Sequence, residues 1–250
     1  SLVGSEMCIR DRDFNPDEEY LQELKSPIYY AVQKDIDIRT GGPTLIDFDM
    51  QRISQRINII LNIRTEGDIK KEDLLPPIIE LSGACGHFNI SEACLDTTRL
   101  YRMVHQAQPD EFTQTGENTY RCVVHFHTLG VIPSAAKGHL NGPGILQVAL
   151  QVSANRLDAS GAPVLDQDGK PVKNSRYIYG AINPYDELTA AQLIEVRDGK
   201  TYLRYSKDDV NIEITSPLVI KADQIVSDDT GMGWQPNDPT NPDDDIIIEI

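Results

Sequence analysis

Apolar and polar residues alternate through residues 119–129, so one side of this stretch is almost wholly apolar or aromatic. A period of two is the signature of a β-strand that faces the core on one side. The residues of that side are Tyr120, Cys122, Val124, Phe126 and Thr128. A second stretch, residues 145–152, repeats the pattern after a glycine-rich corner at 137–144. Its apolar side consists of Leu146, Val148, Leu150 and Val152. We therefore predict two strands joined by a loop.

Turn signals follow these strands at short intervals. Asp158–Gly161 and Asp166–Gly169 each end in glycine, and 197–200 reads as a hairpin turn. Further strands are expected at 176–182, 193–196, 201–205, 210–214 and 218–221, with one or two helical turns at 188–194. This half of the chain is predicted to be a β-dominated antiparallel meander or a sandwich-like domain.

The N-terminal part shows mixed signals. Asn15 before Pro16, followed by acidic residues, favours a short helix ending near Lys25, and strands are expected at 28–32 and 35–39. Residues 49–62 fit both helical and strand spacing, and their length favours a helix. Ser91 is typical of a helix cap, which predicts a second helix that ends at Gln108 before Pro109. The whole chain is thus predicted to be α+β, with a mixed helix-containing N-terminal part.

Changes in composition suggest four segments. Residues 1–12 resemble a translated sequencing adapter and are set aside from fold reasoning. Residues 13–112 form the mixed part, 113–226 the β-rich domain, and 227–250 an acidic tail expected to be disordered. The tail ends in an isoleucine-rich stretch. We expect this to be the first half of an interrupted strand, and the alternative is a strand that adds to a neighbouring sheet.

Charge limits the classes of partner. The 250 residues carry a formal net charge of −16, which repels both nucleic-acid backbones and anionic membranes. No apolar run reaches the length of a membrane-spanning helix. The expected partners are therefore other protein subunits, in a homo- or hetero-oligomer, with no nucleic acid and no membrane insertion. The expected location is a virion or the cell exterior.

Three histidines are the strongest candidates for chemistry. His125 and His127 alternate onto one side of a predicted strand, and His139 lies in the loop that follows. Imidazole groups so placed could hold zinc, copper or iron in a β-barrel, although more often such histidines only line the wetter face of a strand. Cys85 and Cys94 could form a disulfide or bind zinc, and the simpler interpretation is buried free thiols.

Other motifs carry no chemistry. Asp166–Gly169 lacks the closing glutamate of a calcium loop, so we interpret it as a turn. Gly138–Gly144 lacks the lysine of a phosphate-binding loop and precedes a strand. We find no catalytic constellation and expect no cofactor.

One family resemblance bears on function. Residues 35–68 run as an acidic alternating strand, a Gly-Gly turn, an apolar strand, a helix with a repeated Gln-Arg-Ile and then Thr-Glu-Gly-Asp. This order resembles the start of phage baseplate wedge proteins, although residues 69–77 replace the proline motif that follows in that family. The resemblance implies a non-enzymatic structural or assembly protein of a phage tail or baseplate. Two alternatives stay open: an extracellular binding module of a bacterial surface protein, and a metal-dependent β-barrel enzyme using the three histidines.

Overall fold

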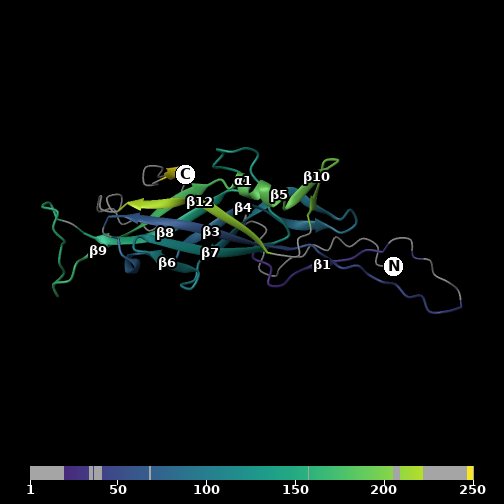
Figure 1. Cartoon of the computed structure of the whole chain (residues 1–250), viewed down its shortest axis with the longest axis horizontal. Helices are drawn as coiled ribbons and strands as arrows, with labels where there is room; N and C mark the ends of the chain where they lie inside the picture. Colours follow the sequence, from purple (N-terminus) through teal and green to yellow (C-terminus); the bar gives the residue numbers. More distant parts are fainter. Residues whose placement is uncertain are drawn as a thin grey trace.

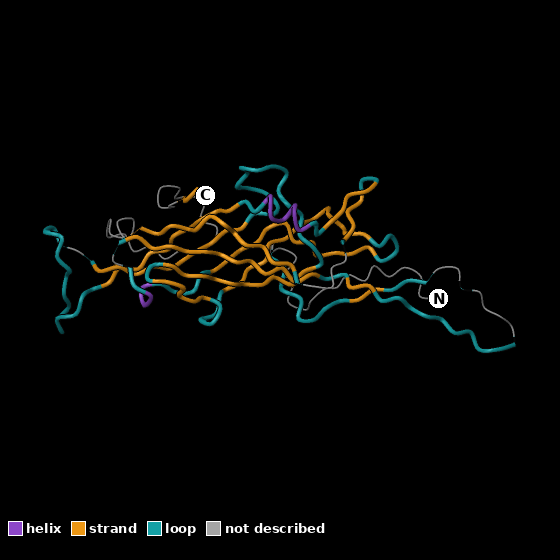
Figure 2. The backbone as a smooth tube through the Cα atoms, in the orientation of Figure 1, coloured by secondary structure: helices purple, strands orange, loops and turns teal. Residues whose placement is uncertain are grey.

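The protein is a β-sandwich with an elongated body (Figures 1 and 2). The computed structural model describes residues 20–33, 36, 41–67, 69–156, 158–204, 209–221 and 247–249. Two sheets, of seven and four strands, pack face to face, and a two-stranded ribbon lies at one end. The β-dominated architecture predicted for the C-terminal half therefore extends to the N-terminal half as well.

The larger sheet has the strand order β10-β11-β5-β4-β8-β9-β13. Its strands are β4 (Ile78–Asn89), β5 (Cys94–Gln106), β8 (Leu146–Asn155), β9 (Lys173–Ile182), β10 (Ile194–Arg197), β11 (Lys200–Leu203) and β13 (Ile247–Glu249). All neighbours are antiparallel except β13, which runs parallel to β9. The last strand of this sheet thus comes from the far end of the chain.

The smaller sheet has the order β12-β3-β7-β6. Its strands are β3 (Gln55–Glu66), β6 (Phe112–Gly116), β7 (Thr119–Thr128) and β12 (Val210–Lys221). The ribbon consists of β1 (Tyr29–Tyr30) and β2 (Gln51–Arg52), and the short helices are η1 (Lys71–Asp73) and α1 (Tyr185–Ala191). Strands from before and after residue 112 pair within both sheets. The two parts expected at 13–112 and 113–226 therefore both contribute strands to each of the two sheets.

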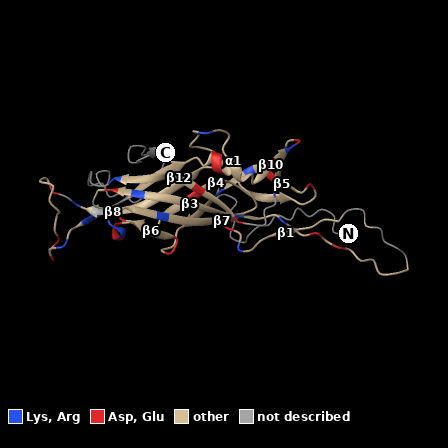
Figure 3. Cartoon of the chain, in the orientation of Figure 1, with Lys and Arg blue, Asp and Glu red and all other residues tan. Residues whose placement is uncertain are grey.

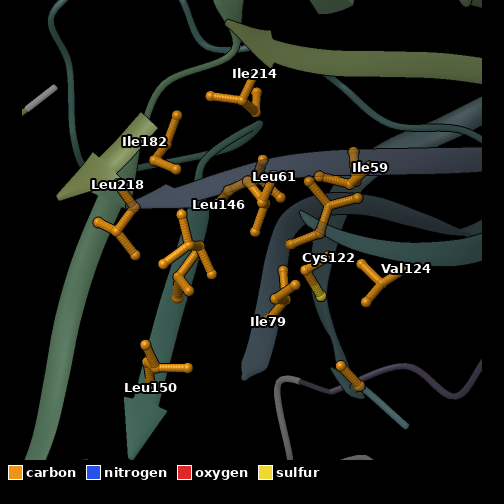
Figure 4. Packing of buried hydrophobic residues seen from close by; sticks show 14 of the residues in the cluster. Ile59, Leu61, Ile79, Cys122, Val124, Leu146, Leu150, Ile182, Ile214 and Leu218 are labelled. Carbon is orange, nitrogen blue, oxygen red and sulfur yellow. The ribbon is translucent and has the colours of Figure 1, made fainter. Parts of the chain in front are cut away.

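The core lies between the two sheets and is built from the alternate residues of each long strand. Ile59 and Leu61 of β3 meet Val124 of β7, Leu146 of β8 and Ile79 of β4 (Figure 4). All five are buried. Burial of each such side chain stabilises the fold by about 1.5–3 kcal/mol, so this layer sets the register of both sheets.

The helix expected over 49–62 is wrong, because residues 55–66 form β3. Both spacings fit this stretch, but Ile57, Ile59, Leu61 and Ile63 are all almost fully buried, as a period of two requires. β3 pairs with β7 on one side and β12 on the other, so it is the central strand of its sheet. β-branched isoleucine suits that position. The helix implied by the resemblance to baseplate proteins is likewise absent here.

The helix expected from Ser91 to Gln108 is also wrong. Residues 90–93 form a turn and β5 begins at Cys94. The Asn89 side chain accepts hydrogen bonds from the Glu92 N–H and from the Ser91 hydroxyl, so the apparent helix cap organises a turn between β4 and β5. Ala93 completes this turn with a positive φ of 56°.

The remaining expectations divide into three groups. The strands at 119–129, 145–152 and 176–182 are confirmed, as is the hairpin turn near Asp198. The helical turns expected at 188–194 lie earlier, in α1 at Tyr185–Ala191, and the strand expected at 28–32 is reduced to Tyr29–Tyr30. The two strands expected between 210 and 221 are one strand, β12, with a register shift between Ile214 and Leu218. The helix expected to end near Lys25 falls partly on residues up to 19, which lie outside the described residues. Residues 20–25 are described and are not helical. Residues 35 and 37–39 and the tail at 227–246 also lie outside the described residues.

Candidate functional site

An N-terminal strap, residues 20–28, crosses from one sheet to the other. The Leu21 N–H donates to the Arg102 carbonyl of β5 at 2.7 Å, and the Leu24 N–H donates to the His127 carbonyl of β7 at 2.9 Å. The Tyr20 hydroxyl donates to Glu80, which also accepts from Arg102. The strap therefore closes one side of the sandwich. It pairs with β5 at Arg102 and with β7 at His127, two positions that no neighbouring strand of either sheet covers on that side.

His127 fastens the middle of this strap. Its Nδ1 lies 2.8 Å from the Leu24 carbonyl, which can only accept, so Nδ1 carries the proton. Its Nε2 lies 3.0 Å from the Ser54 hydroxyl, which in turn accepts from the Ile28 N–H. Burial lowers the pKa of His127, which favours the neutral ring that this arrangement needs. Both ring nitrogens therefore serve the fold.

His105 on β5 and His125 on β7 converge on one carboxylate. Glu111 lies 2.9 Å from His105 Nε2 and 3.5 Å from His125 Nδ1, and the two rings are 5.1 Å apart. The pKa of His105 is raised to about 9. Glu23 of the strap makes the largest contribution and Glu111 raises the pKa further, whereas burial lowers it. Burial opposes ionisation of Glu111, but the Gln108 N–H and the histidines together lower its pKa. His105 is thus a cation held between two carboxylates.

The structure separates the three predicted metal ligands. His125 faces Glu111, His127 holds the strap, and His139 lies exposed in the loop before β8, where its carbonyl accepts from Asn183. Within the described residues, no group of three or more histidine, cysteine or acidic side chains is arranged to hold a metal. The metal site predicted from His125, His127 and His139 therefore gains no support from their positions.

The cysteines of the described residues are free. Cys85, Cys94 and Cys122 are all buried and none is in a disulfide, which confirms the simpler interpretation. Burial raises the pKa of Cys85 and Cys122 to about 12. A thiol with such a pKa carries almost no thiolate at neutral pH, so these two are packing residues and poor nucleophiles.

The outer edge of β9 is the structural feature that suits an interaction best. β8 covers its inner edge along all ten residues, whereas β13 pairs with only Tyr179, Gly180 and Ala181 on the other side. Ile178 and Ile182 point into the core, and Gly180 lies so close to Leu218 of β12 that an added Cβ would be 3.1 Å from it. β9 is therefore held firmly against the core while its outer edge takes a further strand.

The outer edge of β9 was not predicted from the sequence. The isoleucine-rich end was expected to be the first half of an interrupted strand, with addition to a neighbouring sheet as the alternative, and residues 247–249 pair with β9 of the same chain. The cluster of His105 and Glu111 was not predicted either, because His105 lies on β5 and Glu111 in the turn before β6, and only the packing of the two sheets brings them to His125.

Charged residues lie in the loops and at several positions along the strands, such as Arg56 and Arg64 of β3 (Figure 3). None of the helices in the described part of the chain has the length and apolar character needed to cross a membrane.

Comparison with solved structures adds a distant likeness. No protein-family model matches the sequence, and no curated protein matches it. The crystal structure of a "putative adhesin" from Bacteroides ovatus is similar with a TM-score of 0.41 and 7% identity, over 89% of this chain and 66% of that one. A TM-score of this size does not establish a shared fold.

Proposed function

We propose that the protein is a non-enzymatic assembly module that joins other protein subunits by strand addition at the outer edge of β9. The observation that carries this proposal is the parallel pairing of Ile247–Glu249 with Tyr179–Ala181. The other six strands of this sheet pair with one another without β13. The outer edge of β9 therefore accepts a segment that is distant in the sequence. Main-chain hydrogen bonds then supply affinity, and the alternate side chains of the added strand supply specificity.

The other edges of the two sheets are less suited to this role. β6 and β10 have only five and four residues. β12 is long, but Pro217 removes one N–H donor and the register shifts between Ile214 and Leu218. Short, proline-containing or irregular edges resist pairing with further strands. β9 has ten residues in regular register with β8, so it is the longest regular edge in the described residues.

Two settings fit such a module. The first is a phage tail or baseplate, which the resemblance of residues 35–68 implies although β3 replaces the helix of that resemblance. The alternative is an extracellular binding module of a bacterial surface protein. Size-exclusion chromatography with light scattering separates them, since a discrete ring-sized assembly favours the first setting and a monomer favours the second.

A peptide experiment tests the proposed function. A chain ending at residue 242 lacks β13, and a fluorescent peptide of residues 243–250 is titrated onto it after circular dichroism has confirmed its β-sheet content. We expect saturable binding with hydrogen-exchange protection at residues 179–181. The full chain should bind the peptide more weakly, because its own β13 competes. The matched control is the peptide with Ile248→Pro, which lacks a backbone donor.

Equal binding of the two peptides, or protection elsewhere than β9, would contradict strand addition. Absence of binding to a folded truncated chain would contradict the proposed function as a whole.

A further inference from the structure

Exposed apolar side chains are frequent between Tyr29 and Met50, and the described part of the loop between β1 and β2 extends away from the sandwich (Figure 2). Of the twelve exposed large apolar residues in the described part of the chain, seven lie between residues 29 and 50. These seven are Tyr29, Val32, Ile36, Leu45, Ile46, Phe48 and Met50. Scattered apolar residues are normal on a surface, but a concentration of this kind marks an interaction site.

The base of this loop is anchored firmly. The Ile53 N–H donates to the Ile28 carbonyl at 2.8 Å, and the Tyr30 hydroxyl donates to the Ile90 carbonyl at 2.7 Å. The Tyr30 ring also packs edge-on against Phe88. Toward the tip the surroundings are open, because a Cβ added at Gly41 or Gly42 would meet nothing within 4 Å. The loop is thus held at its base, and the space around Gly41 and Gly42 is open.

Residues 44–50, which we call the docking stretch, have the pattern of a half-buried strand. Ile46, Phe48 and Met50 alternate with Asp47 and Asp49. In a strand the three apolar side chains would share one face and the two carboxylates the other. Ile46 is 38% exposed, and Phe48 and Met50 are each 57% exposed. Within the described residues no strand pairs with this stretch, so its apolar face has nothing to cover it in the chain alone.

We propose that the docking stretch adds as a strand to a sheet edge of a different, basic protein. Ile46, Phe48 and Met50 enter the apolar layer under that edge. Asp47 and Asp49 then lie on the solvent side beside lysine or arginine residues of the neighbouring strand, where opposite charges stabilise a cross-strand pair.

Charge identifies the partner as basic and different from this chain. Two copies each carrying a net charge of −16 repel one another. β6 contains no lysine or arginine, and the first half of β12 exposes Asn211 and Glu213 beside Asp209, so neither of these edges complements two carboxylates. β9 contains Lys173 and Arg176, but Lys173 already pairs with Asp73 and β13 occupies the edge at Tyr179–Ala181. The same carboxylates oppose binding to an anionic membrane, where a basic polar face is required.

The inference uses a surface other than β9, so its test and the test of the proposed function can fail separately. The probes are two seven-residue peptides, one alternating lysine with valine and one alternating glutamate with valine, titrated onto the full chain at low and high salt. We expect the lysine peptide to bind and to protect the amides of residues 44–50 from hydrogen exchange. The glutamate peptide should bind at least roughly tenfold more weakly, and salt should weaken the lysine peptide.

Matched variants locate the binding. Phe48→Ser with Met50→Ser removes two apolar anchors and should weaken the lysine peptide by roughly tenfold or more per side chain. Asp47→Asn with Asp49→Asn should remove most of the salt dependence. The control is Leu165→Ser, which changes another side chain that is 57% exposed, on the loop between β8 and β9, and should leave the affinity unchanged.

Three results would overturn the proposal. The first is equal binding of the two peptides. The second is protection of amides outside the docking stretch. The third is self-association of the free chain that the double serine variant abolishes, since the occupant would then be a second copy.

Discussion

At the scale of single residues, the corner before β8 depends on a glycine with no room for a side chain. Gly144 has a φ of +72°, and a Cβ there would lie 2.6 Å from the Ser134 nitrogen and 2.7 Å from the Pro133 Cα. Its N–H donates to the Ser82 carbonyl at 3.0 Å, which ties the corner to β4. The backbone itself therefore blocks any larger residue.

Gly144→Ala should lower the free energy of unfolding by about 2–4 kcal/mol, because backbone atoms must move as well as adopt a strained φ. Urea denaturation measures this change. Gly142→Ala is the matched control, since Gly142 also has a positive φ but has open space around it. That variant should cost about 1 kcal/mol, and equal losses in both variants would show that the close packing contributes nothing.

At the scale of elements, the strap is a segment without helix or long strand that nevertheless closes the sandwich. Its hydrogen bonds go to β5, to β7 and to Ser54, which is the residue before β3. Leu21 and Leu24 pack against the two apolar clusters of the core. His127 holds the middle of the strap, because one ring nitrogen bonds to the Leu24 carbonyl and the other to the Ser54 hydroxyl.

His127→Ala should therefore loosen the strap while the sheets persist. It removes two hydrogen bonds and leaves the Leu24 carbonyl and Ser54 without their partner, which costs about 2–3 kcal/mol. Hydrogen exchange should show faster exchange at Leu24 and Ile28. His139→Ala, in an exposed loop, should change neither quantity. Equal effects in both variants would indicate a shared role such as metal binding and contradict the separate roles described above.

At the scale of the whole molecule, His105 makes stability depend on pH because it sits where the two sheets and the strap meet. Glu23 from the strap, Glu111 before β6 and His125 from β7 all face it. The pKa of His105 is raised to about 9 in the fold, from an ordinary value of 6.5. The folded chain thus binds this proton more tightly than the unfolded chain does.

The corresponding stabilisation is fully present below about pH 6.5 and is lost as the pH rises through about 9. We expect the free energy of unfolding to fall by about 2 kcal/mol between about pH 6 and about pH 10 from this residue. His105→Gln should flatten that decline when both chains are denatured with urea across the same pH range. A decline of the same size in the variant would assign the pH dependence to other groups.

Much of the β-sheet structure could be predicted from the sequence. β7 and β8 were expected because their alternation leaves only one face able to enter a core, and β10 and β11 because Asp198 and Gly199 mark a tight turn. Asp166 was interpreted as a turn residue, and its carboxylate accepts from the Asp168 and Lys170 N–H groups. These features depend on interactions within a few residues, which the local sequence contains.

Only the tertiary structure decided the rest. Residues 55–61 fit two periodicities, and β3 is a strand because β7 and β12 offer hydrogen-bond partners on both sides. The sequence alone placed His125 and His127 together as possible ligands, but the packing of the strap and of β5 gave each a different partner. The β9 edge could not be foreseen, because it is defined by which strands pair and which do not, and strand pairing joins residues far apart in the chain.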